Sequence, residues 1–304
     1  MNETVNIMLV SDRKYLGQMR IMLYSLFETN PRPIRVFLFH SELTEKELRG
    51  VDSYIRHWPN KEFVPIHLTD RELEGLPTSE LFPKEVYFKF LALRNIPIEI
   101  KKVICMDIDM VVQKPMDALF DLEMGEIPLA ACMDIYGYVY GECDLSIRRL
   151  GLAPEHIYFN SGLLCYNLEV IRKLNTVEDL LKTAREHKDH LKWWEQDVLN
   201  LYFDKKCALL PWHLFNCPPV RYVIKIEDAN RGELNPLYQK DLISDNFSGE
   251  GYADYTEAIR DLACVIHYIG ETKPWKADRM ASETYRIFDE PYERIVNAKP
   301  GETG

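Results

Sequence analysis

The sequence lacks the features that mark several large classes of protein. Its seven cysteines are an odd number, and no two of them stand at Cys-x-x-Cys spacing. This argues against a disulfide framework or a zinc ribbon and favours a reducing compartment. No stretch approaches the length of a transmembrane helix. The N-terminal MNETVNIMLV has neither the basic region nor the long apolar run of a signal peptide. These absences predict a cytoplasmic location.

Negative charge outnumbers positive charge, with 48 aspartates and glutamates against 37 lysines and arginines. The 304 residues carry a formal net charge of −11, so broad binding to nucleic acid has no electrostatic support. Because the whole chain is acidic, an anionic ligand could bind only where a positively charged group lies nearby. We find no internal repeat, low-complexity tract or clean linker, and the length fits one large α/β domain.

Apolar runs and helical patterns alternate along the first half of the chain. VNIMLVS, IRVFLFH and EFVPIHL are expected strands, and Pro65 indicates that the third lies at a sheet edge or contains an irregularity. An apolar stripe ending at Asn30 predicts one intervening helix. Thr44 and Glu47 form a capping box that opens a second. This β-α-β-α-β pattern predicts a mostly parallel sheet with helices on both faces.

The second half is less regular. IPLAACMD, IYFNSGLLCYNL, CALLPWHLFN and ACVIHYIG indicate strands, and helices are expected from about Val177 to His187 and from near Glu195. Residues 222–260 are polar and rich in turn formers, which is typical of a long loop or an inserted subdomain near a ligand site. We predict a single domain over residues 1–285, with 222–260 as an irregular insertion, and a C-terminal tail over 286–304 that ends in a disordered PGETG.

The stretch VICMDIDMVV reads as a buried strand, yet it carries Asp107 and Asp109. Unpaired carboxylates are costly to bury, so such groups usually have a partner, a metal or a cleft. Ligands of open α/β sheets bind beyond the carboxyl ends of strands. There the two aspartates could hold one hard divalent cation and leave positions for phosphates. The alternative is that both cap or pair locally where a strand meets a loop.

A second segment, HYIGETKPWK, follows a late apolar strand. His267 offers a nitrogen ligand, which suits Mn²⁺ better than Mg²⁺. Gly270 lets the backbone approach a phosphate closely, and Lys273 offers a point charge to a phosphate oxygen. Taken singly, these residues are best explained as a structural histidine, a turn glycine and a solvated lysine, but the combination is more specific than its parts.

DIDMVV, YFNSGLLCYN, WWEQDVLN and HYIGETKPWK occur in the order, and at roughly the separations, found in glycosyltransferase family 8. Over most of its length the sequence resembles this family of retaining, nucleotide-sugar-dependent enzymes, related to glycogenin, galactinol synthase and bacterial lipooligosaccharide galactosyltransferases. The resemblance implies the GT-A fold, a Rossmann-like mixed α/β domain. It also implies transfer of glucose or galactose from a UDP-sugar to a glycan or other acceptor, lipid-linked saccharides included, with 222–260 on the acceptor side.

The resemblance also assigns the cation and its neighbours. Asp107, Asp109 and His267 would bind Mn²⁺, or Mg²⁺ in its place, which bridges the diphosphate and neutralises charge on the leaving UDP. Lys273 would add positive charge at the same phosphates, and Gly270 its backbone N–H.

SDRKY resembles the family's uridine-binding turn after the first strand. This puts Ser11, Asp12 and Tyr15 near the base and the ribose, where a tyrosine could stack on uracil. Tyr15 taken alone is equally a packing residue at a helix entry.

Three further positions match residues that surround the transferred sugar in relatives: Asp134, Asn160 and Gln196. Amide and carboxylate groups suit sugar hydroxyls, and one of them could stabilise an oxocarbenium-like transition state. Gln196 and Asp197 are the nearest candidates for a group that assists the reaction. No residue stands out as a dedicated nucleophile.

The sequence departs from the family pattern at two of its predicted site residues. Lys89 stands where the family often has arginine, which keeps the charge but loses bidentate contacts to phosphate or sugar. Glu195 stands where aspartate is usual, and its extra methylene could change which sugar hydroxyl is held.

Two other functions fit parts of the sequence. DIDMV matches the nucleophile motif of haloacid-dehalogenase-like phosphatases, but that motif normally closes the first strand of the core, and three expected strands precede it here. The chain could also be a nucleotide-sugar-binding protein that has lost transfer activity.

Overall fold

A seven-stranded sheet forms the centre of the computed structural model, which describes residues 3–76, 84–234, 251–276 and 282–298. The strand order is β3-β2-β1-β4-β7-β6-β8, and two small sheets pair β10 with β9 and β11 with β5. The strands are β1 Val5–Val10, β2 Ile34–His40, β3 Lys61–His67, β4 Lys102–Met106, β5 Met110–Val112, β6 Leu129–Met133, β7 Phe159–Asn167, β8 Cys207–Leu210, β9 Val223–Lys225, β10 Tyr252–Asp254 and β11 Val265–His267.

The direction of the strands confirms the prediction of a mostly parallel sheet. β1 runs parallel to β2 and β4, β2 to β3, and β6 to β8, whereas β7 runs antiparallel to β4 and β6. β3, which contains Pro65, lies at one edge as expected, where a residue without an N–H costs the sheet least.

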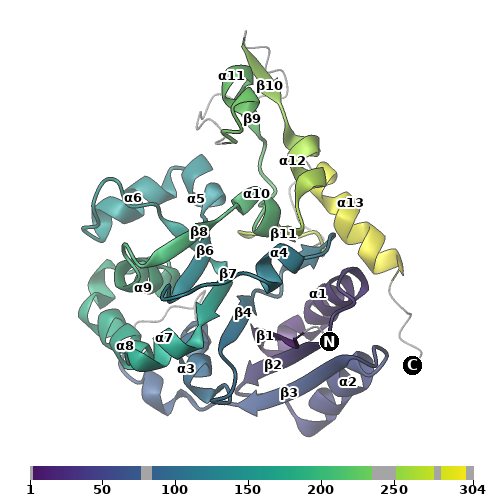
Figure 1. Cartoon of the computed structure of the whole chain (residues 1–304), viewed down its shortest axis with the longest axis vertical. Helices are drawn as coiled ribbons and strands as arrows, with labels where there is room; N and C mark the ends of the chain where they lie inside the picture. The colour runs from purple at the N-terminus through teal and green to yellow at the C-terminus, as the bar shows by residue number, and fades with distance from the viewer. Residues whose placement is uncertain (1–2, 77–83, 235–250, 277–281, 299–304) are drawn as a thin grey trace.

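Helices cover both faces of this sheet (Figure 1). They are α1 Leu16–Thr29, α2 Glu45–Ile55, α3 Phe88–Asn95, α4 Asp117–Phe120, α5 Ile135–Val139, α6 Glu142–Arg149, α7 Leu168–Lys173, α8 Thr176–Glu186, α9 Trp194–Tyr202, α10 Trp212–Phe215, α11 Ile226–Asn230, α12 Thr256–Leu262 and α13 Glu283–Ala298.

The two core clusters follow from the alternation of side chains along the strands. In β1, Ile7 and Leu9 join the cluster that includes α1, α2 and α13, and Met8 joins the cluster that includes α3, α8 and α9. α2 begins at the predicted capping box, in which the Glu47 backbone N–H donates to Thr44 and the Glu47 carboxylate accepts from the Thr44 backbone N–H at 2.8 Å.

Two stretches predicted as single strands are divided in the structure. In CALLPWHLFN, β8 ends before Pro211, and α10 follows directly. Proline cannot donate to a strand ladder, and its fixed φ, here −66°, suits the start of a helix. In VICMDIDMVV, β4 ends at Met106 and β5 begins at Met110, so the aspartates lie in the connection between two strands.

Residues 222–260 contain more regular structure than their composition indicates. β9 and β10 pair antiparallel, and with α11 they form the projection at the top of Figure 1. α12 leads from there back to β11. Residues 235–250 lie outside the described part of the chain.

The predicted C-terminal tail is wrong for residues 286–298, which belong to α13. Phe288 is completely buried, and Tyr292 is nearly so. The hydroxyl of Tyr24, on α1, donates to the carbonyl of Ala298 at 3.0 Å. Apolar side chains at helical spacing therefore dock this helix on the core. The final PGETG segment lies in residues 299–304, outside the described part.

We expect α13 to contribute to the stability of the whole domain. Phe288→Ala removes a fully buried ring and should lower the free energy of unfolding by about 3–5 kcal/mol. Arg286→Ala, an exposed change on the same helix, should alter it by less than about 0.5 kcal/mol. Urea unfolding followed by circular dichroism measures both, and equal effects would contradict this docking.

Candidate active site

Asp107, Asp109 and His267 come together although 158 positions separate Asp109 from His267 in the sequence. The two aspartates follow β4, and His267 is the last residue of β11. β11 pairs antiparallel with β5 so that His267 lies opposite Met110. The His267 Nε2 atom is 3.1 Å from Asp109 Oδ1 and 3.8 Å from Asp107 Oδ2. One ligand atom from each residue lies within 4.8 Å of the others. Oxygen and imidazole donors in this grouping fit a divalent cation.

Two lysines balance the charge of these carboxylates. Lys273 Nζ lies 2.5 Å from Asp109 Oδ2, and Lys89 Nζ lies 2.7 Å from Asp107 Oδ1. Burial alone would raise the pKa of Asp109, but His267 and Lys273 outweigh it and lower that pKa. Asp109 is therefore held as the carboxylate that a cation requires.

The amino group of Lys89 is already paired with two carboxylates, those of Asp107 and Glu195. Burial would lower its pKa, but Asp107 and Glu195 outweigh it and raise the pKa well above the usual value. Glu195 Oε1 is 3.5 Å from Lys89 Nζ and accepts a hydrogen bond from the Ser161 hydroxyl at 3.2 Å. The two departures from the family pattern thus contact each other, and Lys89 supports the carboxylate of Asp107.

The predicted sugar-side residues form one hydrogen-bonded group. The Gln196 amide nitrogen donates to Asp134 Oδ2 at 3.0 Å, and Gln196 Oε1 accepts from Asn160 Nδ2 at 3.1 Å and from the Ser161 backbone N–H at 2.9 Å. Asp134 also caps α5 by accepting from the Gly137 backbone N–H. Burial raises the pKa of both Asp134 and Glu195.

Asp197 lies apart from this group. Its fully buried carboxylate pairs with Arg149 at 3.0 Å and accepts the hydroxyl of Tyr158 at 2.6 Å. It also accepts the backbone N–H groups of Lys192 and Trp193. These contacts hold Asp197 at the start of α9, turned toward Arg149 and Tyr158.

A cavity of about 400 Å³ opens beside the metal-ligating group. Its lining brings the predicted nucleotide residues to one place, because Ser11, Asp12 and Tyr15 contribute to the same cavity as Asp107, Asp109, Lys89, Glu195 and Lys273. The carboxylate of Asp12 accepts the Tyr15 backbone N–H at 3.2 Å and caps the turn after β1. Tyr15 is 40% exposed, so its ring is available to a ligand.

Two glycines permit close approaches around the site. Gly270 has φ +83°, and a Cβ there would lie 2.6 Å from the Tyr136 hydroxyl. A Cβ at Gly162 would overlap Cε1 of His267 and lie 2.7 Å from its Nδ1. Nothing in the local sequence YFNSGLLCYN indicates that the His267 ring packs on Gly162, so only the structure reveals this contact.

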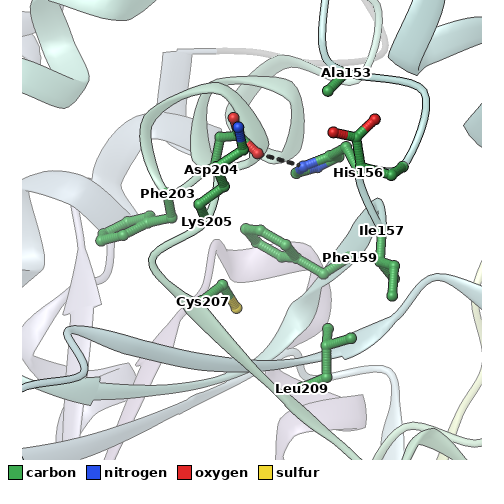
Figure 2. Close-up of a pocket in the computed structure, with 10 residues that line it drawn as sticks. Ala153, His156, Ile157, Phe159, Phe203, Asp204, Lys205, Cys207 and Leu209 are labelled. Carbon is green, nitrogen blue, oxygen red and sulfur yellow. Dashed lines mark hydrogen bonds and ion pairs between the residues drawn. The ribbon is translucent and has the colours of Figure 1, made fainter.

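Phe159, Phe203 and Leu209 help to line a second cavity, of about 210 Å³ (Figure 2). His156 in its wall is held between Asp204, at 2.9 Å from Nδ1, and Asn200, at 3.0 Å from Nε2. None of the predicted site residues lines this cavity. The cavity beside Asp107 and Asp109 is therefore the candidate active site.

Gly162 provides a test of this geometry. Gly162→Ala should displace the His267 ring, weaken Mn²⁺ binding by at least about 10-fold, and lower stability by about 1–3 kcal/mol through overpacking. Gly17→Ala is the matched control, because a Cβ there meets nothing within 4 Å. It should leave Mn²⁺ binding unchanged and raise helix stability by about 0.5–1 kcal/mol. Calorimetric titration with Mn²⁺ and thermal unfolding measure both, and unchanged Mn²⁺ affinity in Gly162→Ala would refute the arrangement.

No helix among the described residues is long and apolar enough to cross a membrane.

Comparison with curated proteins finds relatives in bacteria. The chain is 28% identical over 282 residues to an Escherichia coli lipopolysaccharide 1,2-glucosyltransferase, covering 90% of this chain and 74% of that protein. It is 22% identical to the lipopolysaccharide 1,3-galactosyltransferase of Salmonella typhimurium, covering 87% and 71%. The glycosyltransferase GlyA of Streptococcus pneumoniae is 24% identical over 94% of this chain, which spans only 34% of GlyA.

Among solved structures, the galactosyltransferase LgtC in complex with donor and acceptor sugar analogs superposes with a TM-score of 0.71, at 20% identity and 98% coverage of both chains. This likeness confirms the predicted GT-A fold. The model of the family described as glycosyl transferase family 8 matches residues 6–279. With nearly its whole length covered by that model, the chain is a glycosyltransferase and belongs to glycosyl transferase family 8.

Proposed function

We propose that this glycosyltransferase moves a hexose, glucose or galactose, from a UDP-sugar to a saccharide acceptor with retention of anomeric configuration. The observation that carries the proposal is the convergence of Asp107, Asp109 and His267 beside a cavity of about 400 Å³. The cavity's other walls include Tyr15 and Lys273, an aromatic ring and a positive charge that suit a nucleoside diphosphate.

The cation in this proposal is Mn²⁺, or Mg²⁺ in its place. An imidazole nitrogen beside two carboxylates favours Mn²⁺. When bound, the cation would supply positive charge to the diphosphate of the donor. Lys273, paired with Asp109 at 2.5 Å, would lie beside the same phosphates.

The protein's own groups would orient the donor at both ends. Tyr15 and Asp12 would hold the base and ribose, since both line the cavity. Glu195 lines it too, and would bind sugar hydroxyls next to Lys89. Behind it, the hydrogen bonds among Asp134, Asn160 and Gln196 would hold the sugar-side groups in place, a preorganised arrangement of the kind that lowers reorganisation cost.

The acceptor in this proposal is a glycan, and the lipopolysaccharide named for the relatives suggests a lipid-linked one. Residues 222–234 and 251–260, with β9 and β10, would form the acceptor side. Membership of a glycosyltransferase family argues against the phosphatase alternative. A nucleotide-sugar-binding protein without transfer activity is the alternative that experiment must separate.

Metal removal tests the proposal directly. With a panel of UDP-sugars and Mn²⁺, we expect slow release of UDP from one donor, abolished by EDTA. Asp109→Asn should reduce the rate at least about 100-fold, because a cation ligand is lost. Asp189→Asn, which changes an exposed carboxylate, should leave the rate unchanged. Binding of UDP and Mn²⁺ without release from any donor, and without transfer to any acceptor, would instead identify a silent binder.

The stereochemical part of the proposal has its own test. When the preferred α-linked donor is hydrolysed in the absence of acceptor, retention predicts that the α-anomer of the free hexose appears first. Proton NMR of the anomeric signals, recorded before mutarotation, would measure this. Initial appearance of the β-anomer would show inversion.

A further inference from the structure

His267 is bound on both sides of its ring. Its Nε2 faces Asp107 and Asp109, and its Nδ1 lies 2.7 Å from Oδ1 of Asn216. Asn216 follows α10 and is 1% exposed. No motif marks Asn216 in the sequence, and the direction of its hydrogen bond with His267 depends on how its amide is oriented.

Backbone donors settle the orientation of the amides. The Gly162 backbone N–H, which can only donate, lies 2.9 Å from Asn160 Oδ1 and identifies that atom as the oxygen. The Asn216 atom 3.1 Å from the same oxygen must then be the donor, Nδ2. Its other terminal atom, facing His267, is an oxygen. The His267 Nδ1 therefore carries a hydrogen, and Nε2 is the nitrogen left to bind a cation.

The same orientation continues away from the metal-ligating group. Asn160 donates to Gln196 Oε1, which the Ser161 backbone N–H identifies as an oxygen, and Gln196 donates to Asp134. Each amide thus donates toward the Asp134 carboxylate. One directed chain of side-chain hydrogen bonds runs from His267 to Asp134.

We propose that Asn216 is a positioning residue with two tasks. Its oxygen holds the Nδ1–H of His267, so that Nε2 is presented to a cation between Asp107 and Asp109. Its amide N–H holds Asn160, and through it Gln196, in register for the donor sugar. The second task rests on the proposed function, whereas the first concerns cation binding alone. Loss of a hydrogen-bond partner of a metal-ligating histidine typically lowers metal affinity by about 10- to 100-fold. A titration resolves a change of this size.

The first measurement needs neither a sugar nor an added cation. In ¹⁵N-labelled protein without added metal, the His267 signals, assigned by their loss in His267→Gln, should show Nδ1 bearing the hydrogen when the ring is neutral. A neutral ring with the hydrogen on Nε2 would overturn the proposal. This result stands whether or not any UDP-sugar is cleaved.

The second measurement compares variants by titration with Mn²⁺ alone. Asn216→Ala should weaken Mn²⁺ binding about 10- to 100-fold. Asn216→Asp, which keeps an oxygen for Nδ1–H but offers no N–H to Asn160, should restore most of that affinity. At saturating Mn²⁺, its rate of UDP release should stay well below that of the wild type. Mn²⁺ affinity within two-fold of wild type in Asn216→Ala, or no recovery in Asn216→Asp, would overturn the first task.

Asn30→Ala is the control for a general loss of stability. Asn30 is also 1% exposed, donates to the Leu26 carbonyl and accepts from the Met116 backbone N–H. We expect it to lower the free energy of unfolding as Asn216→Ala does, without changing Mn²⁺ affinity. Equal loss of Mn²⁺ affinity in both variants would show that Asn216 acts only through the stability of the core, and would overturn the proposal.

Discussion

Carboxylates held largely out of water at the end of β4 impose the main constraint on this structure. Leaving a buried charge unpaired lowers the free energy of unfolding by about 3–5 kcal/mol. Asp107 is paired with Lys89 from α3, and Asp109 with Lys273 from the segment after β11. The positions of α3 and β11 around the sheet are therefore tied to the electrostatics of one small region. The same balance keeps Asp109 ionised and ready for a cation.

A layer of amides supports these charged groups from behind. Hydrogen bonds link Asn216 to His267 and to Asn160. They continue from Asn160 to Gln196 and from Gln196 to Asp134, and so join several elements. Asn200 adds a clamp between α9 and β7, since its amide accepts from the Phe159 N–H and donates to the Phe159 carbonyl. Polar networks of this kind, fully satisfied, hold side chains in one arrangement. The site is thus built on rigid elements and not on loops alone.

The parts that depart most from a plain α/β sheet lie outside its seven strands. β9, β10 and α11 project from the body, and α13 returns along α1 (Figure 1). Function within a shared fold commonly varies through such peripheral segments, while the scaffold stays the same.

Local patterns in the sequence determined most of the central fold. The alternation of strands and helices, the capping box at Thr44 and the edge position of Pro65 depend on residues close to one another, so they could be read directly. Asp-Ile-Asp indicated a candidate cation site for the same reason, and the resemblance to the family pointed to His267, which the structure places beside both aspartates.

Contacts between distant segments were decided only by the tertiary structure. The pairing of β11 with β5 brings His267 to Asp109, and no local period encodes it. Asp197 follows Gln196 directly, yet a step of one residue turns its side chain by about 100° around α9, toward Arg149 and away from the sugar-side group. Asn216 stands among ordinary loop residues, and only the folded chain places it against His267. Such roles depend on which side chains from distant segments come into contact, and those contacts form only when the whole domain has folded.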